Sequence, residues 1–263
     1  MCASGAKLFK ISIANEKGGV AKTTTAVSLA AAFAELGFTA LLVDADAQAN
    51  ATLALGLEPE SQKQTLFNAF LQSTDIQTII QPTSTPGVSI IPANRQVTLI
   101  EKDLTRLDGF ETRLSSILKP VSTLFDFAIF DCPPFLGSVT LNTLTAADFL
   151  IIPTQAEYYS IYALRNMMQL VRTVRTRFNT GLTYRLLITI FDQRNRIHRN
   201  LGQQLQVDFS LGLFQTIIQV DTRLRESPVE GKTVFQLAPH SRATCQYRSL
   251  AQELLEYKND RES

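Results

Sequence analysis

The sequence is poor in cysteine and histidine, contains no tryptophan, and has no long uninterrupted apolar run. Its three cysteines, Cys2, Cys132 and Cys245, are far apart and odd in number, so neither a disulfide framework nor a cysteine metal site is predicted. Glu35 interrupts the longest apolar stretch, residues 27–43, which falls short of the roughly 18 residues of a membrane-spanning helix. The N-terminus lacks the apolar segment of a signal peptide. We therefore expect a cytoplasmic protein that does not cross a membrane.

Charged residues make up only 19% of the 263 residues, whereas apolar residues make up 45%. This composition excludes a disordered chain, which needs low hydropathy and a high net charge. The net charge is +1 but is unevenly distributed, because residues 161–225 contain ten arginines, no lysine and three acidic residues. Arginine forms bidentate contacts with phosphate, so this segment is a candidate surface for a polyanion. The alternative interpretation is an ordinary solvated helix face.

Short apolar runs alternate with longer amphipathic stretches along most of the chain. The short runs predict strands at residues 9–14, 39–44, 88–91, 127–131, 149–153, 184–191 and 214–219. The longer stretches predict helices at residues 23–36, 65–70, 99–108, 111–118, 138–147, 162–178 and 241–257. Nearly all-apolar strands are typical of a parallel sheet with helices on both faces. We therefore predict a single doubly wound α/β domain over residues 9–257, between a short N-terminal arm (1–8) and a polar tail (258–263).

A glycine-containing loop, NEKGGVAK at residues 15–22, follows the first predicted strand and leads into a helix that opens with Lys-Thr. Glycines let backbone N–H groups approach phosphate oxygens, and the N-terminus of the helix adds partial positive charge. In such a cradle Lys22 would reach the β- and γ-phosphates and the Thr23 hydroxyl would bind Mg²⁺. Glu16 and Ala21 occupy the two glycine positions of the strict pattern GxxxxGK[ST]. The loop nevertheless predicts a site for nucleotide phosphates.

Two further predicted strands end in a carboxylate. Asp44 ends the strand ALLVD, and Asp131 ends the strand FAIFD. In a parallel sheet these carboxyl ends lie at the edge where ligands bind. An aspartate at this position can simply cap the following helix. Two of them beside a phosphate loop favour catalysis or Mg²⁺ binding.

Several motifs, in order along the chain, give this sequence a family resemblance. The loop is similar to the deviant Walker A motif KGGxGK[ST], and VDADAQANAT (43–52) resembles the signature VDxDPQGNAT. The chain is identified on these motifs as a ParA/Soj-type member of the ParA/MinD superfamily of P-loop ATPases. Further matching segments are IPAN (91–94), FDCPP (130–134), QAEYYS (155–160), FDQRNR (191–196), which resembles YDxRxxL, and VDTRLRESP (220–228), which resembles NVRLSEAP.

The resemblance implies a role for each residue of the loop and for both aspartates. The cofactors would be ATP and Mg²⁺, in a homodimer that holds two nucleotides between its subunits. Lys17 would reach the partner's phosphates, Lys22 those of its own subunit, and Asp44 would position the attacking water. The implied nucleotide-binding residues are Lys17, Gly18, Gly19, Val20, Ala21, Lys22, Thr23 and Thr24, and the implied Mg²⁺ site is formed by Thr23 and by Asp131 through water.

The sequence departs from the family pattern at three positions. Ala21 replaces the glycine before Lys22, while Ala47 and Ala49 replace the proline and glycine of DPQGN. If Ala21 has helical dihedral angles, its methyl group costs little. If it has a positive φ, the cost is about 1–2 kcal/mol. These departures leave nucleotide binding a firmer expectation than hydrolysis.

Partition ATPases of this family bind duplex DNA without sequence preference, which needs a shared basic surface. Arg196, Arg223 and Arg225 are the DNA-binding candidates, because they lie in or beside the segments that resemble family motifs. MinD-like members instead end in a basic amphipathic membrane helix. The apolar stripe within residues 249–257 has an acidic polar face, so we expect it to dock on the protein body. We expect no helix-turn-helix domain before the phosphate loop.

The hypothesis is therefore a nucleoid-associated ParA-like ATPase that hydrolyses ATP slowly, is stimulated by a partner protein, and positions a plasmid, a chromosome or a protein cargo. A nucleotide-dependent dimeric scaffold with little turnover and a MinD-like positioning ATPase are the alternatives. A reductase resembling the nitrogenase iron protein shares the loop but needs two cysteines per subunit at the dimer interface. Only Cys132 directly follows one of the predicted site aspartates, Asp131.

Overall fold

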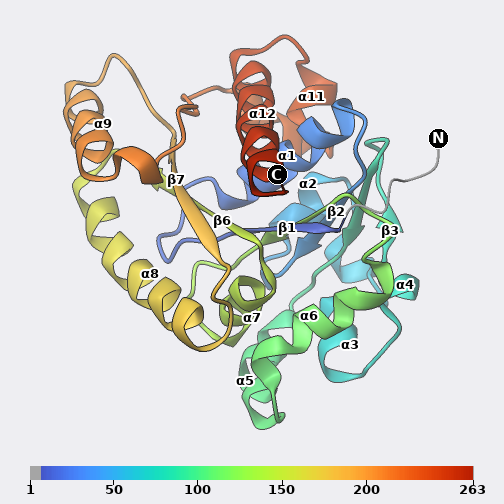
Figure 1. The fold of residues 1–263 in the computed structure, drawn as a ribbon. Helices are drawn as coiled ribbons and strands as arrows, with labels where there is room; N and C mark the ends of the chain where they lie inside the picture. Colours follow the sequence, from blue (N-terminus) through green and yellow to red (C-terminus); the bar gives the residue numbers. More distant parts are fainter. Residues whose placement is uncertain (1–6, 263) are drawn as a thin grey trace.

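A seven-stranded sheet forms the centre of the protein (Figure 1). The computed structural model describes residues 7–262, apart from the side chains of residues 159, 161–163, 211 and 262. Most of the predicted N-terminal arm thus lies outside the described residues. The strand order is β3-β4-β2-β5-β1-β6-β7, parallel except for the edge strand β3. The strands are β1 (Phe9–Ile13), β2 (Ala40–Asp44), β3 (Gln81–Pro82), β4 (Val88–Ile91), β5 (Phe127–Asp131), β6 (Phe149–Gln155) and β7 (Thr183–Thr189).

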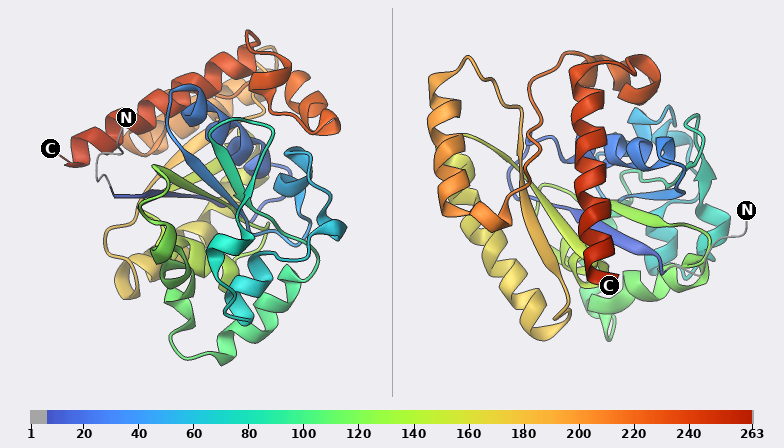
Figure 2. Two further views of the ribbon diagram at one scale, coloured as in Figure 1. Left: turned by 90° about the vertical axis from the view of Figure 1, so that its right-hand side faces the viewer. Right: turned by 45° about the horizontal axis from the view of Figure 1, so that its top comes forward.

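Helices cover both faces of the sheet, as two views in Figure 2 show. One face carries α1 (Lys22–Glu35), α2 (Asn50–Ala54), α10 (Arg223–Glu226), α11 (Val234–Leu237) and α12 (Arg242–Glu262). The other carries α3 (Leu66–Leu71), α4 (Ile76–Ile79), α5 (Val97–Asp103), α6 (Arg113–Leu118), α7 (Ser138–Ala146) and α8 (Tyr158–Arg177). Helix α9 (Arg196–Asp208) lies beyond β7 at the edge. The predicted doubly wound α/β fold is confirmed.

Two hydrophobic cores, one on each face, explain why these segments form the elements they do. All five residues of β2 and of β5 are buried, as expected for strands covered on both sides. Helix α8 turns the residues Leu164, Met167 and Val171 toward the sheet at spacings of three and four, which is the helical period. The sheet is thereby held rigid, and its carboxyl edge can present loops in fixed positions.

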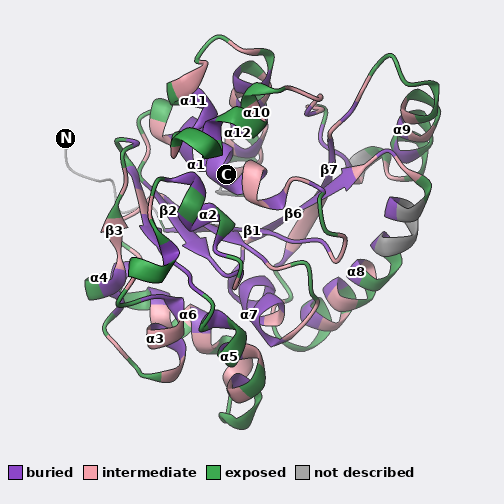
Figure 3. Ribbon diagram, turned by 180° about the vertical axis from the view of Figure 1, so that it is seen from behind, coloured by how far each residue is buried: buried purple, intermediate pink, exposed green. Residues whose placement is uncertain are grey.

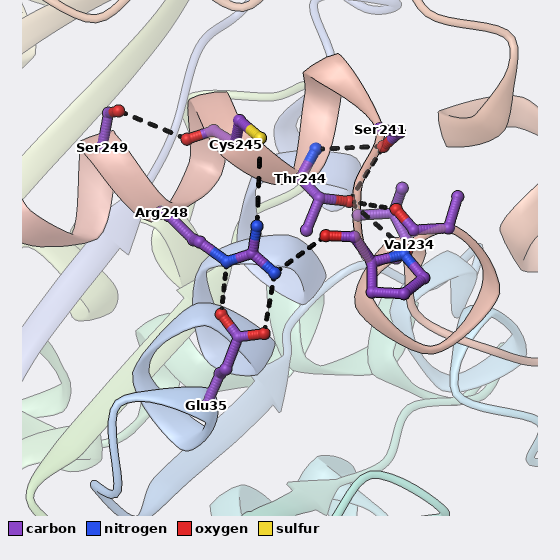
Figure 4. A network of polar contacts seen from close by, with 9 residues as sticks. Glu35, Val234, Ser241, Thr244, Cys245, Arg248 and Ser249 are labelled. Atoms are coloured by element: carbon purple, nitrogen blue, oxygen red, sulfur yellow. Dashed lines mark hydrogen bonds and ion pairs between the residues drawn. The ribbon is translucent and has the colours of Figure 1, made fainter.

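Helix α12 packs along α1, so the apolar stripe near the C-terminus docks on the protein body as predicted. Tyr247, Leu250 and Leu254 are completely buried. Arg248 clamps the two helices together, because its guanidinium donates to both carboxylate oxygens of Glu35, at 2.5 and 2.9 Å (Figure 4). This bidentate geometry lowers the pKa of Glu35. Among the described residues, no helix is both long and apolar enough to cross a membrane.

The secondary structure differs from the predicted elements in several places. Residues 214–219 do not form a strand. The amides of Phe214 and Ile218 donate to carbonyls of β7, but the amides of Gln215 and Thr216 between them donate to the carboxylate of Glu253 in α12, so no continuous ladder forms. Helix α9 was not predicted, because it buries only Gly202 and Leu205 and its sequence is largely polar. Helix α12 continues to Glu262, beyond the predicted end of that helix at residue 257.

Candidate nucleotide-binding site

The loop between β1 and α1 is hydrogen-bonded to the strands β6 and β7. The Asn15 side chain donates from Nδ2 to the Pro153 carbonyl in β6 (2.7 Å) and accepts from the Lys17 amide (3.0 Å). The Thr189 hydroxyl at the end of β7 donates to the Val20 carbonyl (3.0 Å). The Val20 side chain is fully buried, so only its backbone can meet a ligand. These bonds hold the loop in one shape without using the amides of its centre.

The centre of the loop is open enough to receive phosphate groups. A Cβ built on Gly18 or Gly19 would meet no atom within 4 Å, and Gly19 has a φ of +74° that favours glycine. No side chain caps the N-terminus of α1. Its first N–H groups therefore have no side-chain acceptor, and together with the positive end of the helix dipole they suit an anion.

Ala21 and Ala49 both have left-handed backbone conformations, with φ values of 65° and 53°. The sequence did not determine the backbone conformation of Ala21. Its positive φ is the conformation that costs an alanine about 1–2 kcal/mol. Each alanine stands just before a helix, at the N-terminal boundary of α1 and of α2. At both positions, where the family pattern has glycine, the alanine thus has a backbone conformation that favours glycine.

We expect Ala21→Gly to stabilise the nucleotide-free protein. The relief of left-handed strain exceeds the greater entropy loss of glycine by about 0.5–1 kcal/mol. Ala34→Gly, inside α1, is the matched control and should destabilise by about 0.5–1 kcal/mol. Urea unfolding of both variants checks the prediction. A loss of stability in Ala21→Gly equal to that in Ala34→Gly would contradict the left-handed assignment.

Lys22 is buried at the base of the loop, with 7% of its surface exposed. Its ammonium donates to the Lys17 carbonyl at 3.0 Å. Burial lowers the pKa of Lys22, and the charge of Asp131 opposes that shift. The side chain also lines the large cavity beside the loop. A buried cation in this place can neutralise the charge on bound phosphate.

Asp44 and Asp131 lie side by side at the ends of β2 and β5, where they are register partners, and both are completely buried. Burial raises the pKa of Asp44 to about 6. Burial and the neighbouring Asp44 raise that of Asp131 well above its ordinary value. Neither carboxylate oxygen of Asp131 has a hydrogen-bond partner within 3.5 Å among the described residues, although the nearby Thr23 hydroxyl partly opposes the rise of its pKa. Buried acceptors without donors are costly, so Asp131 suits a site that a hydrated cation completes.

A cavity of about 490 Å³ opens beside the loop and is large enough for a nucleotide. One wall is formed by the loop and the start of α1, including the predicted residues Gly18, Gly19, Ala21, Lys22, Thr23 and Thr24. The opposite wall was not predicted and is formed by Ile190, Ile218, Gln219, Val220, Asp221, Leu224 and Arg225. The sequence indicated this second wall of the cavity only through the resemblance of residues 220–228 to a family motif. Ile190 is strained there, with a φ of 52°.

Lys17 does not point into the cavity of its own subunit. Its ammonium is held by Gln155 Oε1 at 2.8 Å, Glu157 Oε2 at 2.6 Å and Ser160 Oγ at 2.9 Å. These three residues belong to the segment QAEYYS, which the sequence singled out without a role. The segment therefore serves as a resting place for the Lys17 side chain in the single chain.

The three candidate DNA-binding arginines have different surroundings. Arg225 lines the cavity, and the Arg223 guanidinium forms an ion pair with Glu226 at 2.7 Å. Both belong to α10, which contacts α11, whereas exposed Arg196 begins α9 beyond β7 (Figure 3). The structure therefore assigns Arg225 a place at the nucleotide cavity that the sequence did not predict.

The two described cysteines do not form a cluster site. Cys132 is 1% exposed, and burial raises the pKa of its thiol to about 11. Cys245 is exposed on α12. A buried, protonated thiol is unsuited to hold a metal cluster at an interface, which argues against the reductase alternative.

Comparison with known proteins decides the family. A sequence profile described as an AAA domain matches residues 9–184. The sporulation initiation inhibitor protein Soj of Bacillus subtilis is 37% identical over 245 residues, which cover 93% of this chain and 97% of Soj. The chromosome partitioning protein ParA of Myxococcus xanthus is 36% identical, with 93% of this chain and 87% of ParA covered. The chain belongs to the ParA/Soj family of partition ATPases.

The fold of this ParA/Soj-family chain is also found in solved structures. Cobyrinic acid a,c-diamide synthase from Mycobacterium smegmatis, solved with ADP and magnesium, superposes with a TM-score of 0.85. It is 29% identical, and 96% of each chain is covered. The predicted family and P-loop fold are therefore confirmed.

Proposed function

We propose that this ParA/Soj-family chain binds ATP with Mg²⁺ in the cavity beside the loop and hydrolyses it slowly. The observation that carries the proposal is the unpartnered, buried carboxylate of Asp131 next to buried Lys22, at the mouth of an open glycine loop. Such a donor set fits Mg²⁺, which keeps several waters and takes few protein ligands. When bound, Mg²⁺ supplies charge neutralisation at the phosphates.

Each residue of the site has a role that depends on its position. The backbone of residues 18–21 and the N-terminus of α1 hold phosphate oxygens, and Lys22 compensates their charge. Thr23 would ligate the cation directly and Asp131 through water, while Thr24 contacts the α-phosphate. Asp44 orients the attacking water. This is catalysis by positioning and electrostatics, as phosphoryl transfer requires.

A homodimer that places two nucleotides between its subunits would complete the site. Lys17 supports this, because its ammonium is held by residues that a partner's phosphates can replace. The large exposed apolar side chains Leu53, Phe135 and Tyr158 also follow the carboxyl ends of β2, β5 and β6, at the edge that bears the loop. Exposed apolar groups gathered at one edge suit burial in an interface. Hydrolysis would then depend on dimerisation.

Non-specific DNA binding would use the exposed arginines of α9 and α10. Phosphate neutralisation of this kind does not depend on sequence and weakens with salt. Arg223 must exchange Glu226 for a DNA phosphate, whereas Arg196 is exposed at the start of α9. On this basis the protein is a nucleoid-associated, cytoplasmic ATPase that positions a DNA or protein cargo, with hydrolysis stimulated by a partner protein.

The experiment that tests DNA binding is fluorescence anisotropy with a random-sequence duplex, in ATP–Mg²⁺, ADP–Mg²⁺ or no nucleotide, at several salt concentrations. We expect binding only with ATP, and a loss of about tenfold in affinity for Arg196→Ala, Arg223→Ala or Arg225→Ala. Arg106→Ala is the matched control, because Arg106 forms an exposed i,i+3 ion pair with Asp103 as Arg223 does with Glu226. ATP binding is measured for every variant, since Arg225 lines the cavity.

The absence of DNA binding in every nucleotide state would contradict this part of the proposal. The second candidate function, a dimeric scaffold with little turnover, would then stand. Left-handed Ala21 and Ala49 favour it, because strained alanines stand at the start of α1 and of α2, in the two segments that would lie nearest the phosphates. Phosphate release by the wild-type protein distinguishes the two functions.

A further inference from the structure

We propose that Arg225 binds a phosphate group of the nucleotide rather than DNA, from the wall of the cavity opposite the glycine loop. Arg225 lines this cavity, and among the described residues that line it only Lys22 is also a cation. Lys22 is buried and donates to the Lys17 carbonyl. Arg225 is exposed, and its side chain has no hydrogen bond or ion pair with any described residue. The inference rests on the proposed function, which places ATP in this cavity.

The two arginines of α10 face different surroundings. Helical residues two positions apart lie about 200° apart around the helix axis, so they do not share a face. The Arg223 guanidinium is held by Glu226 at 2.7 Å, and Arg223 does not line the cavity. Arg225 does line it, so one DNA duplex lying on α10 would not meet both guanidinium groups in these positions.

The segment that carries Arg225 is fixed by the start of α12. The Arg242 guanidinium donates to the Val220 carbonyl at 2.6 Å, and the Ala243 amide donates to Asp221 Oδ2 at 3.2 Å. Asp221 Oδ1 accepts the amide two residues further along, at 3.1 Å. The carboxylate of Asp221 is therefore occupied by backbone amides and does not neutralise Arg225. A cation on a fixed wall, without a carboxylate partner, suits an anionic group of the ligand.

The chemistry of this wall separates a place for the base from a place for phosphate. Ile190, Ile218 and Leu224 give the wall an apolar surface that suits a base. The planar guanidinium of Arg225 instead has two parallel donors that match two phosphate oxygens. The pattern NVRLSEAP has serine at the position of Arg225, so the family resemblance does not account for this cation. It would neutralise phosphate charge from the side opposite Lys22.

The first test is the displacement of a fluorescent ATP analogue by ATP and by adenosine, with Mg²⁺ and without DNA. We expect Arg225→Ala to weaken the binding of ATP about tenfold and that of adenosine less than about twofold. Arg225→Lys keeps the charge but not the fork, so its loss for ATP should be about threefold. Arg175→Ala is the matched control, because Arg175 on α8 is also exposed and without a side-chain partner among the described residues. It should bind ATP as the wild type does.

The second test separates the phosphates of the nucleotide from those of DNA. At saturating ATP, Arg225→Ala should bind a random-sequence duplex with wild-type affinity, whereas Arg223→Ala should remain about tenfold weaker. Wild-type affinity for ATP in Arg225→Ala, an equal loss for adenosine, or a loss of DNA affinity that ATP does not restore would overturn the proposal. If Lys22→Ala binds ATP as tightly as the wild type, the proposed function fails instead, so the two failures are distinguishable.

Discussion

Asp44→Asn is expected to reduce phosphate release by about 10²–10⁴-fold, the usual effect of removing a group that directs proton transfer to or from water. Asparagine has the same shape and can still accept a bond at its carbonyl oxygen, so nucleotide affinity should change little. The measurement is single-turnover release of phosphate, beside a titration with a fluorescent ATP analogue. Asp131→Asn is the comparison, and it should instead raise the Mg²⁺ concentration needed for binding.

The same substitution should stabilise the nucleotide-free protein at neutral pH. Burial raises the pKa of Asp44 to about 6 in the folded state, against an ordinary value of 3.8. The folded state therefore holds the proton more tightly, and its stability is lost as pH rises from about 4 through 6. Above that range the ionised, buried group costs about 2–3 kcal/mol, which asparagine avoids. Removing its charge also relieves Asp131, whose pKa is raised in part by Asp44.

Urea unfolding without nucleotide or Mg²⁺, at pH 4 and at pH 7.5, measures this effect. Asp44→Asn should exceed the wild type in stability at pH 7.5 and match it near pH 4. A variant that gains stability yet keeps wild-type turnover would show that Asp44 is a buried acid without a part in hydrolysis.

Lys17→Ala is expected to abolish ATP-dependent dimerisation and to lower phosphate release by about 10²–10³-fold, as the loss of one electrostatic group at a reacting phosphate does. Binding of ATP to the single chain should persist, because Lys22 and the loop backbone remain. Sedimentation velocity with and without ATP, together with phosphate release, checks the prediction. Lys63→Ala, at an exposed lysine between α2 and α3, is the control.

A second variant tests the resting contact of Lys17. Glu157→Gln removes the charge that holds the Lys17 ammonium at 2.6 Å, so it should dimerise with ATP at a lower protein concentration than the wild type. Both ends of this pair are partly exposed, which keeps the expected shift within about tenfold. An ATP dimer in Lys17→Ala as stable as that of the wild type would rule out a role for Lys17 across the interface.

Most of the strands and helices could be predicted from local sequence patterns. Each error in that prediction has a physical cause. The strands β2 and β5 were predicted because every one of their residues is apolar apart from the final aspartate. The segment at 214–219 was also predicted as a strand from its apolar residues, but it contains two glutamines and a threonine, and the carboxylate of Glu253 in α12 accepts hydrogen bonds from two of its amides. Helix α9 was missed because a helix at the edge of a sheet needs few apolar residues, and only Gly202 and Leu205 are buried.

The sequence by itself determined the family, the loop and the meeting of Lys22, Asp44 and Asp131, because the carboxyl ends of parallel strands share one edge. It could not determine the left-handed angles of Ala21 and Ala49, since alanine prefers other conformations and only the surrounding fold imposes these. Tertiary structure also decided the resting contacts of Lys17 and the place of Arg225 at the cavity. These join groups that are close in space but far apart in the chain, and local pattern carries no information about such distances.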